Sequence, residues 1–114
     1  MTTIYHNPRC SKSRQTLELL TNQGIDVNII RYLDTPLSFQ QLSVLLDQLG
    51  YSAHQLIRQG EAKYKFLGLS AETAERELIT AMVENPILIE RPIVVHNGLA
   101  KIGRPPEQVL GLFK

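Results

Sequence analysis

The sequence predicts an α/β fold: a mixed four-stranded sheet flanked by helices, with a helical insertion between the two halves of the fold. Two observations predict it. Strand-like segments occur only near the two ends of the chain, and the residues between them are helical in pattern. A chain of 114 residues lies within the usual size range of one domain. We therefore expect a single domain over residues 1–114, with a sheet-bearing core at 1–33 and 87–114 and the insertion at about 38–85.

The first part of the chain predicts a strand, a helix and a second strand. Residues 2–6, "TTIYH", are β-branched and aromatic, and an Asn-Pro pair follows them. Residues 11–22 space their leucines as one buried face of a helix requires. Residues 27–33, "VNIIRYL", form the second strand-like run, which ends at an Asp-Thr-Pro turn signal. The β-α-β order favours parallel pairing of these two strands.

The middle of the chain predicts helices. Residues 38–50 begin with Ser38 and Gln41 at the spacing of a capping box, repeat leucine at helical intervals and end on glycine. Residues 52–60 repeat the same start signal, and residues 70–86 supply a longer helix that a proline ends.

The last part of the chain predicts a hairpin and a closing helix. Asn97-Gly98 separates the strand-like runs 93–96 and 99–102, and Asn-Gly is the strongest short signal for a two-residue hairpin turn. Residues 105–114 begin with two prolines, which suit a first helical turn, and place apolar residues on one side. The complete order, β, α, β, helices, β, β, α, matches a thioredoxin-like layout.

Composition limits the partners and the compartment. Twelve Lys and Arg against eleven Asp and Glu give a net charge of +1, which argues against nucleic acid as a partner. No apolar run is long enough to cross a bilayer, and the first residues do not resemble a signal peptide, so we expect a cytoplasmic protein without a membrane partner. The single cysteine excludes an intramolecular disulfide, so any thiol partner comes from another molecule.

Cys10 has the surroundings of a reactive thiol. It lies at the predicted start of a helix among polar and cationic residues, where helix N–H groups and nearby cations lower a cysteine pKa. Arg14 follows four residues later on the same helix face, close enough to hold an oxyanion against the sulfur together with the loop N–H groups and the Ser13 hydroxyl. His6 is a candidate positive or hydrogen-bonding neighbour of the thiolate.

Other histidines and arginines are harder to place from spacing. His54 and His96 lack such a setting and are expected to be ordinary surface residues. Three arginines stand out: Arg58 ends an apolar helical turn, and Arg91 and Arg104 each precede a proline. Taken singly, each is expected to be structural, and sequence spacing does not show that they converge.

Four segments resemble the ArsC-type arsenate reductases of the thioredoxin-like superfamily. They occur in the family's order along the whole chain: "HNPRCSKSR", "LIRQGEAKYKFLGL", "NPILIERPIVV" and "KIGRPPEQVL". The resemblance implies that Cys10 is the nucleophile and that three arginines bind the oxyanion, namely Arg58, Arg91 and Arg104. It also implies that His6 helps to depress the thiol pKa, that Ser13 and Arg14 support the loop, and that the bond before Pro92 is cis.

The same resemblance implies a reaction. The thiolate attacks arsenate or a similar oxyanion, glutathione attacks the adduct as co-substrate, and glutaredoxin reduces the resulting mixed disulfide. We expect no bound cofactor and no metal, because one thiol and scattered histidines form no ligand cluster.

Two other functions remain open. One is a glutathione-dependent thiol oxidoreductase of the same family with another substrate, in which the arginines bind glutathione carboxylates. The other is a regulator similar to Spx, which binds RNA polymerase. Spx-like proteins typically use a Cys-x-x-Cys switch, and Ser13 occupies the second position here.

Overall fold

The computed structural model describes residues 1–114, which divide into two units. The first unit comprises Met1–Thr35 and Arg91–Lys114, and the second comprises Pro36–Glu90. Because the second unit is continuous in sequence, the chain leaves the first unit once and returns to it once.

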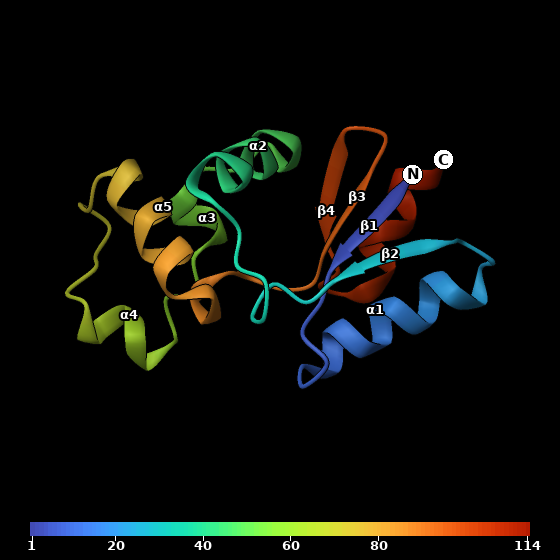
Figure 1. The fold of residues 1–114 in the computed structure, drawn as a ribbon, viewed down its shortest axis with the longest axis horizontal. Helices are drawn as coiled ribbons and strands as arrows, with labels where there is room; N and C mark the ends of the chain where they lie inside the picture. The colour runs from blue at the N-terminus through green and yellow to red at the C-terminus, as the bar shows by residue number, and fades with distance from the viewer. The chain divides into compact units, whose positions relative to one another are not determined.

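The first unit contains a mixed four-stranded sheet. Its strands are β1 (Thr2–Tyr5), β2 (Val27–Ile30), β3 (Ile93–His96) and β4 (Leu99–Ile102), in the spatial order β2-β1-β3-β4 (Figure 1). β1 pairs in parallel with β2 and antiparallel with β3, which in turn pairs antiparallel with β4. The predicted parallel and antiparallel pairings are therefore both confirmed.

Two helical segments pack on one face of this sheet. They are α1 (Ser11–Asn22) and the 3-10 helix η2 (Pro106–Phe113). Ile4 of β1 and Val94 of β3 are register partners, so their side chains lie on the same face. Both are fully buried in one cluster with a leucine of α1 and a valine of η2. Burial of this cluster holds α1 against the sheet.

The hairpin between β3 and β4 turns through Asn97 and Gly98, as the sequence predicts. Both residues have positive φ, 51° and 82°, the backbone form that a two-residue hairpin turn of this kind requires. The turn fixes the register of the two strands, in which Ile93 lies opposite Ile102.

The second unit is helical. Its helices are α2 (Phe39–Leu49), α3 (Ala53–Leu56), α4 (Ala62–Phe66), α5 (Glu75–Glu84) and the 3-10 helix η1 (Pro86–Leu88). The capping box at the start of α2 is confirmed, because Ser38 Oγ accepts from the Gln41 N–H while Gln41 Oε1 accepts from the Ser38 N–H. None of the helices in the chain is long and apolar enough to span a membrane.

Several sequence expectations were wrong in detail. The segment 52–60 is helical only over Ala53–Leu56, the helix expected over 70–86 spans Glu75–Glu84, and the closing helix is a 3-10 helix. The predicted strand at 27–33 ends at Ile30, because a turn follows in which the Asp34 N–H donates to the carbonyl of Arg31. His96 is not an ordinary surface residue: its Nδ1 lies 2.9 Å from Thr2 Oγ1 and its ring contacts Phe113. His54 is also partly buried, with its Nδ1 3.7 Å from a carboxylate oxygen of Glu75.

Candidate active site

The loop between β1 and α1 holds Cys10 at the start of the helix. Cys10 is the N-cap residue of α1 and has extended backbone angles. Asn7 organises the loop: its carbonyl accepts from the Cys10 N–H, and its side-chain oxygen accepts from the Arg9 N–H, both at 3.0 Å. From the sequence, Asn7 was expected only to end a strand. Asparagine before proline is a known turn signal, and it was available to predict this role.

The Cys10 thiol is half-buried and its surroundings favour the ionised form. Partial burial raises the pKa of the thiol. Hydrogen bonds from the Ser13 N–H, the Arg91 side chain and the Lys12 N–H, together with the Arg91 charge, lower that pKa by more, so that it lies below the ordinary value. The predicted shift toward thiolate at a helix start therefore agrees in direction with the structure.

Arg91 and Arg104 come together because the hairpin pairs them. Counting outward from Asn97-Gly98 places Arg91 opposite Arg104, and the Arg104 Nε donates to the Arg91 carbonyl at 2.8 Å. Arg104 Nη2 also donates to Cys10 Sγ at 3.5 Å. For this pair the sequence does predict proximity, because the Asn97-Gly98 turn fixes the register that places the two residues opposite each other.

Two cis peptide bonds and a closely packed glycine lie next to Arg91 and Arg104 in the sequence. The bonds Arg91-Pro92 and Arg104-Pro105 are both cis; only the first was anticipated. Gly103, between β4 and Arg104, is buried against α1. A Cβ added at Gly103 would collide with Thr16 Oγ1 and would lie 2.9 Å from Pro92 Cγ. Only glycine therefore fits at this point of contact between α1 and the arginine-bearing strands.

Ser13 and His6 form a buried pair behind the sulfur. Ser13 Oγ lies 2.6 Å from His6 Nδ1 and accepts from the Asn7 N–H at 3.0 Å. Burial lowers the pKa of His6, and the charges of Arg31 and Arg14 lower it further, so that the neutral ring is favoured. The lowered pKa disfavours a positive His6, and its ring is hydrogen-bonded to Ser13 Oγ rather than to the sulfur. A direct role of His6 in stabilising the thiolate stays a prediction.

The structure assigns Arg14 a contact within the loop. Its Nη1 donates to the Pro8 carbonyl at 2.9 Å, which ties the helix to the loop before it. This contact fits the supporting role implied by the resemblance better than the anion-binding role inferred from the spacing of Cys10 and Arg14 alone.

Arg58 belongs to the second unit. Its guanidinium pairs with Glu61 at 3.4 Å and with Glu90 at 3.2 Å. Its backbone N–H donates to the Leu88 carbonyl at 2.7 Å, close to an isolated bridge between Ile57 and Ile89. Its assignment to the oxyanion site stays a prediction.

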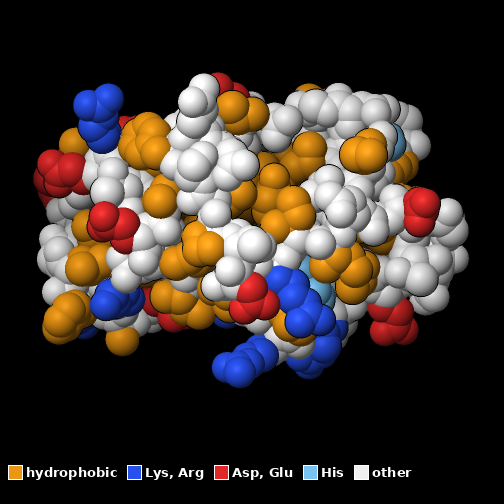
Figure 2. All heavy atoms as spheres, viewed as in Figure 1, with side chains coloured by type: hydrophobic (Ala, Val, Ile, Leu, Met, Phe, Trp, Pro, Cys, Tyr) orange, Lys and Arg blue, Asp and Glu red, His pale blue; other side chains and the backbone are white.

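The local charge around the thiol is positive although the chain is nearly neutral. Lys and Arg side chains gather near the loop that joins β1 to α1, beside a histidine, whereas charges elsewhere on the visible face are scattered (Figure 2). No group of three or more His, Cys, Asp or Glu side chains is arranged to hold a metal ion. A thiolate with two guanidinium groups beside it is equipped for nucleophilic attack on a tetrahedral oxyanion.

Comparison with known proteins identifies close relatives. The model of the ArsC family matches residues 5–112. The uncharacterized protein YfgD of Escherichia coli K12 is 57% identical over 109 residues, which cover 94% of this chain and 92% of that protein. An arsenate reductase of Haemophilus influenzae is 47% identical over 112 residues, with 96% and 97% covered.

A solved structure extends the likeness to the fold. An arsenate reductase from Vibrio cholerae is 51% identical and superposes with a TM-score of 0.94, over 97% of this chain and 96% of that one. The thioredoxin-like layout that the order of elements predicts is thereby confirmed.

Proposed function

The chain belongs to the ArsC family, and on that premise we propose that it is an arsenate reductase whose nucleophile is the Cys10 thiolate. The observation that carries the proposal is the convergence of Arg91 and Arg104 on a thiol whose pKa is lowered. Arsenate is an anion, so a thiolate approaches it against charge repulsion. Guanidinium groups beside the sulfur neutralise that repulsion in the transition state.

In the first step the sulfur attacks arsenic. A Cys10 S–As bond forms and the bond between arsenic and one hydroxyl breaks. The hydroxyl takes up one proton, equivalent to the proton that the thiol lost on ionisation, and leaves as water. Arsenic remains pentavalent in this adduct. The N–H groups of Lys12 and Ser13, which hold the thiolate before attack, are backbone groups and stay in place throughout.

In the second step an external thiol attacks the Cys10 sulfur. A mixed disulfide forms, and the electron pair of the S–As bond goes to arsenic, which leaves as arsenite in the trivalent state. Two sulfurs are oxidised while arsenic is reduced by two electrons. Glutathione is the thiol that the family implies, and the absence of a second cysteine in the sequence requires a donor of this kind.

In the third step a thiol of glutaredoxin attacks the glutathione sulfur of the mixed disulfide. Cys10 is released as thiolate, and glutaredoxin carries the glutathione away. No bound cofactor or metal takes part in the proposed cycle. A reducing compartment is needed throughout, so we place the protein in the cytoplasm.

A coupled assay tests the function. NADPH consumption is followed with arsenate, glutathione, glutaredoxin and glutathione reductase, and the wild type is compared with Cys10→Ser. We expect arsenate-dependent consumption for the wild type and none above background for the variant. Equal rates for the two proteins would refute the proposal.

A further inference from the structure

The formal charge of the chain is divided unequally between its two units. The first unit carries eight Lys and Arg against four Asp and Glu, a formal net charge of +4. The second unit carries four against seven, a formal net charge of −3. The near neutrality of the whole chain therefore conceals a positive unit, and that unit contains the reactive thiol.

The cations of the first unit are concentrated at one edge of its sheet. β1, β2 and β4 end at this edge and β3 begins there, because β1 is parallel to β2 and both β1 and β4 are antiparallel to β3 (Figure 1). Six of the eight cationic residues lie in the loops or in the first helical turn at these strand ends. They are Arg9, Lys12, Arg14, Arg31, Arg91 and Arg104.

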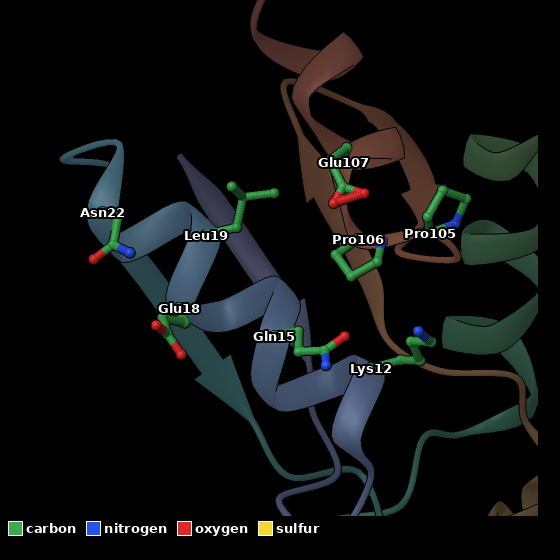
Figure 3. A pocket seen from close by; sticks show the side chains of 8 residues that line it. All are labelled: Lys12, Gln15, Glu18, Leu19, Asn22, Pro105, Pro106 and Glu107. Carbon is green, nitrogen blue, oxygen red and sulfur yellow. The ribbon is translucent and has the colours of Figure 1, made fainter.

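Three of these six side chains have no function in the site described above, namely those of Arg9, Lys12 and Arg31. None of the three forms an ion pair. Arg9 and Arg31 are exposed, and Lys12 is partly buried. Lys12 lines a pocket together with Glu18 and Glu107 but pairs with neither (Figure 3). The charges of these three residues therefore act on the surrounding solvent without a neutralising contact.

The charge of Arg31 also acts inside the loop that holds the thiol. The His6 N–H donates to the Ile30 carbonyl at 2.8 Å, so the residue that follows Ile30 lies beside the start of the loop. Burial lowers the pKa of His6, and the Arg31 charge lowers it further. Burial raises the pKa of Cys10, and hydrogen bonds and the Arg91 charge lower it by more. The charge that ionises the thiol is thus separate from the charge of Arg31.

We propose that Arg9, Lys12 and Arg31 form a cationic rim that attracts anions to Cys10 and favours a doubly charged tetrahedral oxyanion over singly charged and neutral compounds; the identity of that anion rests on the proposed function. The rim acts before the anion reaches the guanidinium groups beside the sulfur. One unit charge about 10 Å away in water raises the local concentration of a monoanion about two-fold and that of a dianion about four-fold. The same field accelerates association.

Two alkylating reagents of different charge test the rim. Iodoacetate is a monoanion and iodoacetamide is neutral, and both alkylate the same Cys10 thiolate. The ratio of their rate constants cancels a change in thiol pKa and therefore reports the potential at the sulfur. The wild type is compared with Arg9→Gln/Arg31→Gln, which retains the backbone hydrogen bonds of both positions. The double variant should lower the ratio about two- to four-fold at 0.01 M salt.

The matched control is Lys101→Gln/Lys114→Gln, which removes the same charge from the same unit. Both lysines are exposed. Lys114 follows Phe113, whose ring contacts His96 at the opposite edge of the sheet. The Lys101 side chain extends beside Gly111, two residues before Phe113. The control should therefore leave the ratio nearly unchanged.

Salt provides a second control within the same experiment. At 1 M salt the Debye length is about 3 Å, so the wild type and the rim variant should give nearly equal ratios. Equal ratios for these two proteins at 0.01 M salt, an equal decrease in the lysine control, or a decrease that persists at 1 M salt would each overturn the inference.

The alkylation experiment contains no arsenate, which separates the inference from the proposed function. In the coupled assay at low salt, kcat/KM for arsenate should fall in the rim variant by about the square of the change in the alkylation ratio, because the substrate carries two charges. An unchanged kcat/KM would overturn the inference. A ratio that falls as expected in a protein without arsenate turnover would refute the proposed function alone.

Discussion

Arg104 Nη2 donates a hydrogen bond to Cys10 Sγ at 3.5 Å, although the two residues are 94 positions apart in the sequence. The contact depends on two separate pieces of structure. The β1–α1 loop positions the sulfur, and the β3–β4 hairpin positions the guanidinium. Changes in either piece should therefore be measurable at the thiol.

Arg91→Ala should raise the thiol pKa and reduce arsenate turnover on the order of 10²-fold, because it removes both a hydrogen bond and a charge that stabilise the thiolate. The pH dependence of Cys10 alkylation by iodoacetamide measures the pKa. Arg76→Ala, at an exposed arginine of α5, is the control. Unchanged alkylation profiles in the Arg91 variant would remove Arg91 from the site.

Ser13→Ala should destabilise the fold by about 1 to 3 kcal/mol, because it leaves the buried Asn7 N–H and His6 Nδ1 without their shared partner. The backbone N–H of residue 13, which faces the sulfur, is retained. Urea unfolding measures the loss. Ser11→Ala, at an exposed position of the same helical turn, should leave the free energy of unfolding nearly unchanged; equal losses for the two variants would contradict the account.

Gly103→Ala should destabilise the protein by about 1 to 3 kcal/mol, because the new methyl group collides with Thr16 and Pro92. The double variant with Thr16→Ala removes two of the three contacting atoms and should recover part of the loss. Thermal unfolding of the single and double variants tests this coupling. Gly111→Ala, where the nearest atom is 3.4 Å away on the flexible Lys101 side chain, is the control. Additive losses in the double variant would show that the two residues are not in conflict.

Acid should destabilise the protein partly through His6. The pKa of His6 is lower in the folded protein than its ordinary value of about 6.5. Below that value the unfolded chain binds a proton that the folded protein does not, so stability falls as pH drops toward the folded pKa. His6→Asn should lose less stability than the wild type between about pH 7 and pH 5. Parallel losses in urea unfolding would contradict the assigned direction of the pKa shift.

Local signals in the sequence predicted the elements of the fold well. The Asn97-Gly98 turn and the Ser38 capping box depend on neighbouring residues alone, and both occur as expected. α4 lies within the predicted helical insertion, but its own bounds were not predicted, because none of its residues is buried and it has no apolar periodicity. β2 was predicted to continue to residue 33 but ends at Ile30, because the carbonyl of Arg31 accepts turn hydrogen bonds. The apolar residues on either side of Arg31 have the pattern of a continuing strand.

Only part of the candidate site could be predicted from the sequence. Cys10 at a helix start follows from local pattern, and the pairing of Arg91 with Arg104 follows from the hairpin register. The direction of their guanidinium groups toward the sulfur does not, because it depends on how α1 packs at Gly103. The role of His6 also needed the structure, since burial decides which protonation state is favoured.

The ionisation of Cys10 is the property on which the whole account depends. The most direct measurement is a pH titration of the ultraviolet absorbance of the thiolate in the wild type, with Cys10→Ser subtracted to remove the tyrosine contribution. The account predicts an apparent pKa below the value of about 8.5 for a free cysteine. An apparent pKa at or above that value would contradict it.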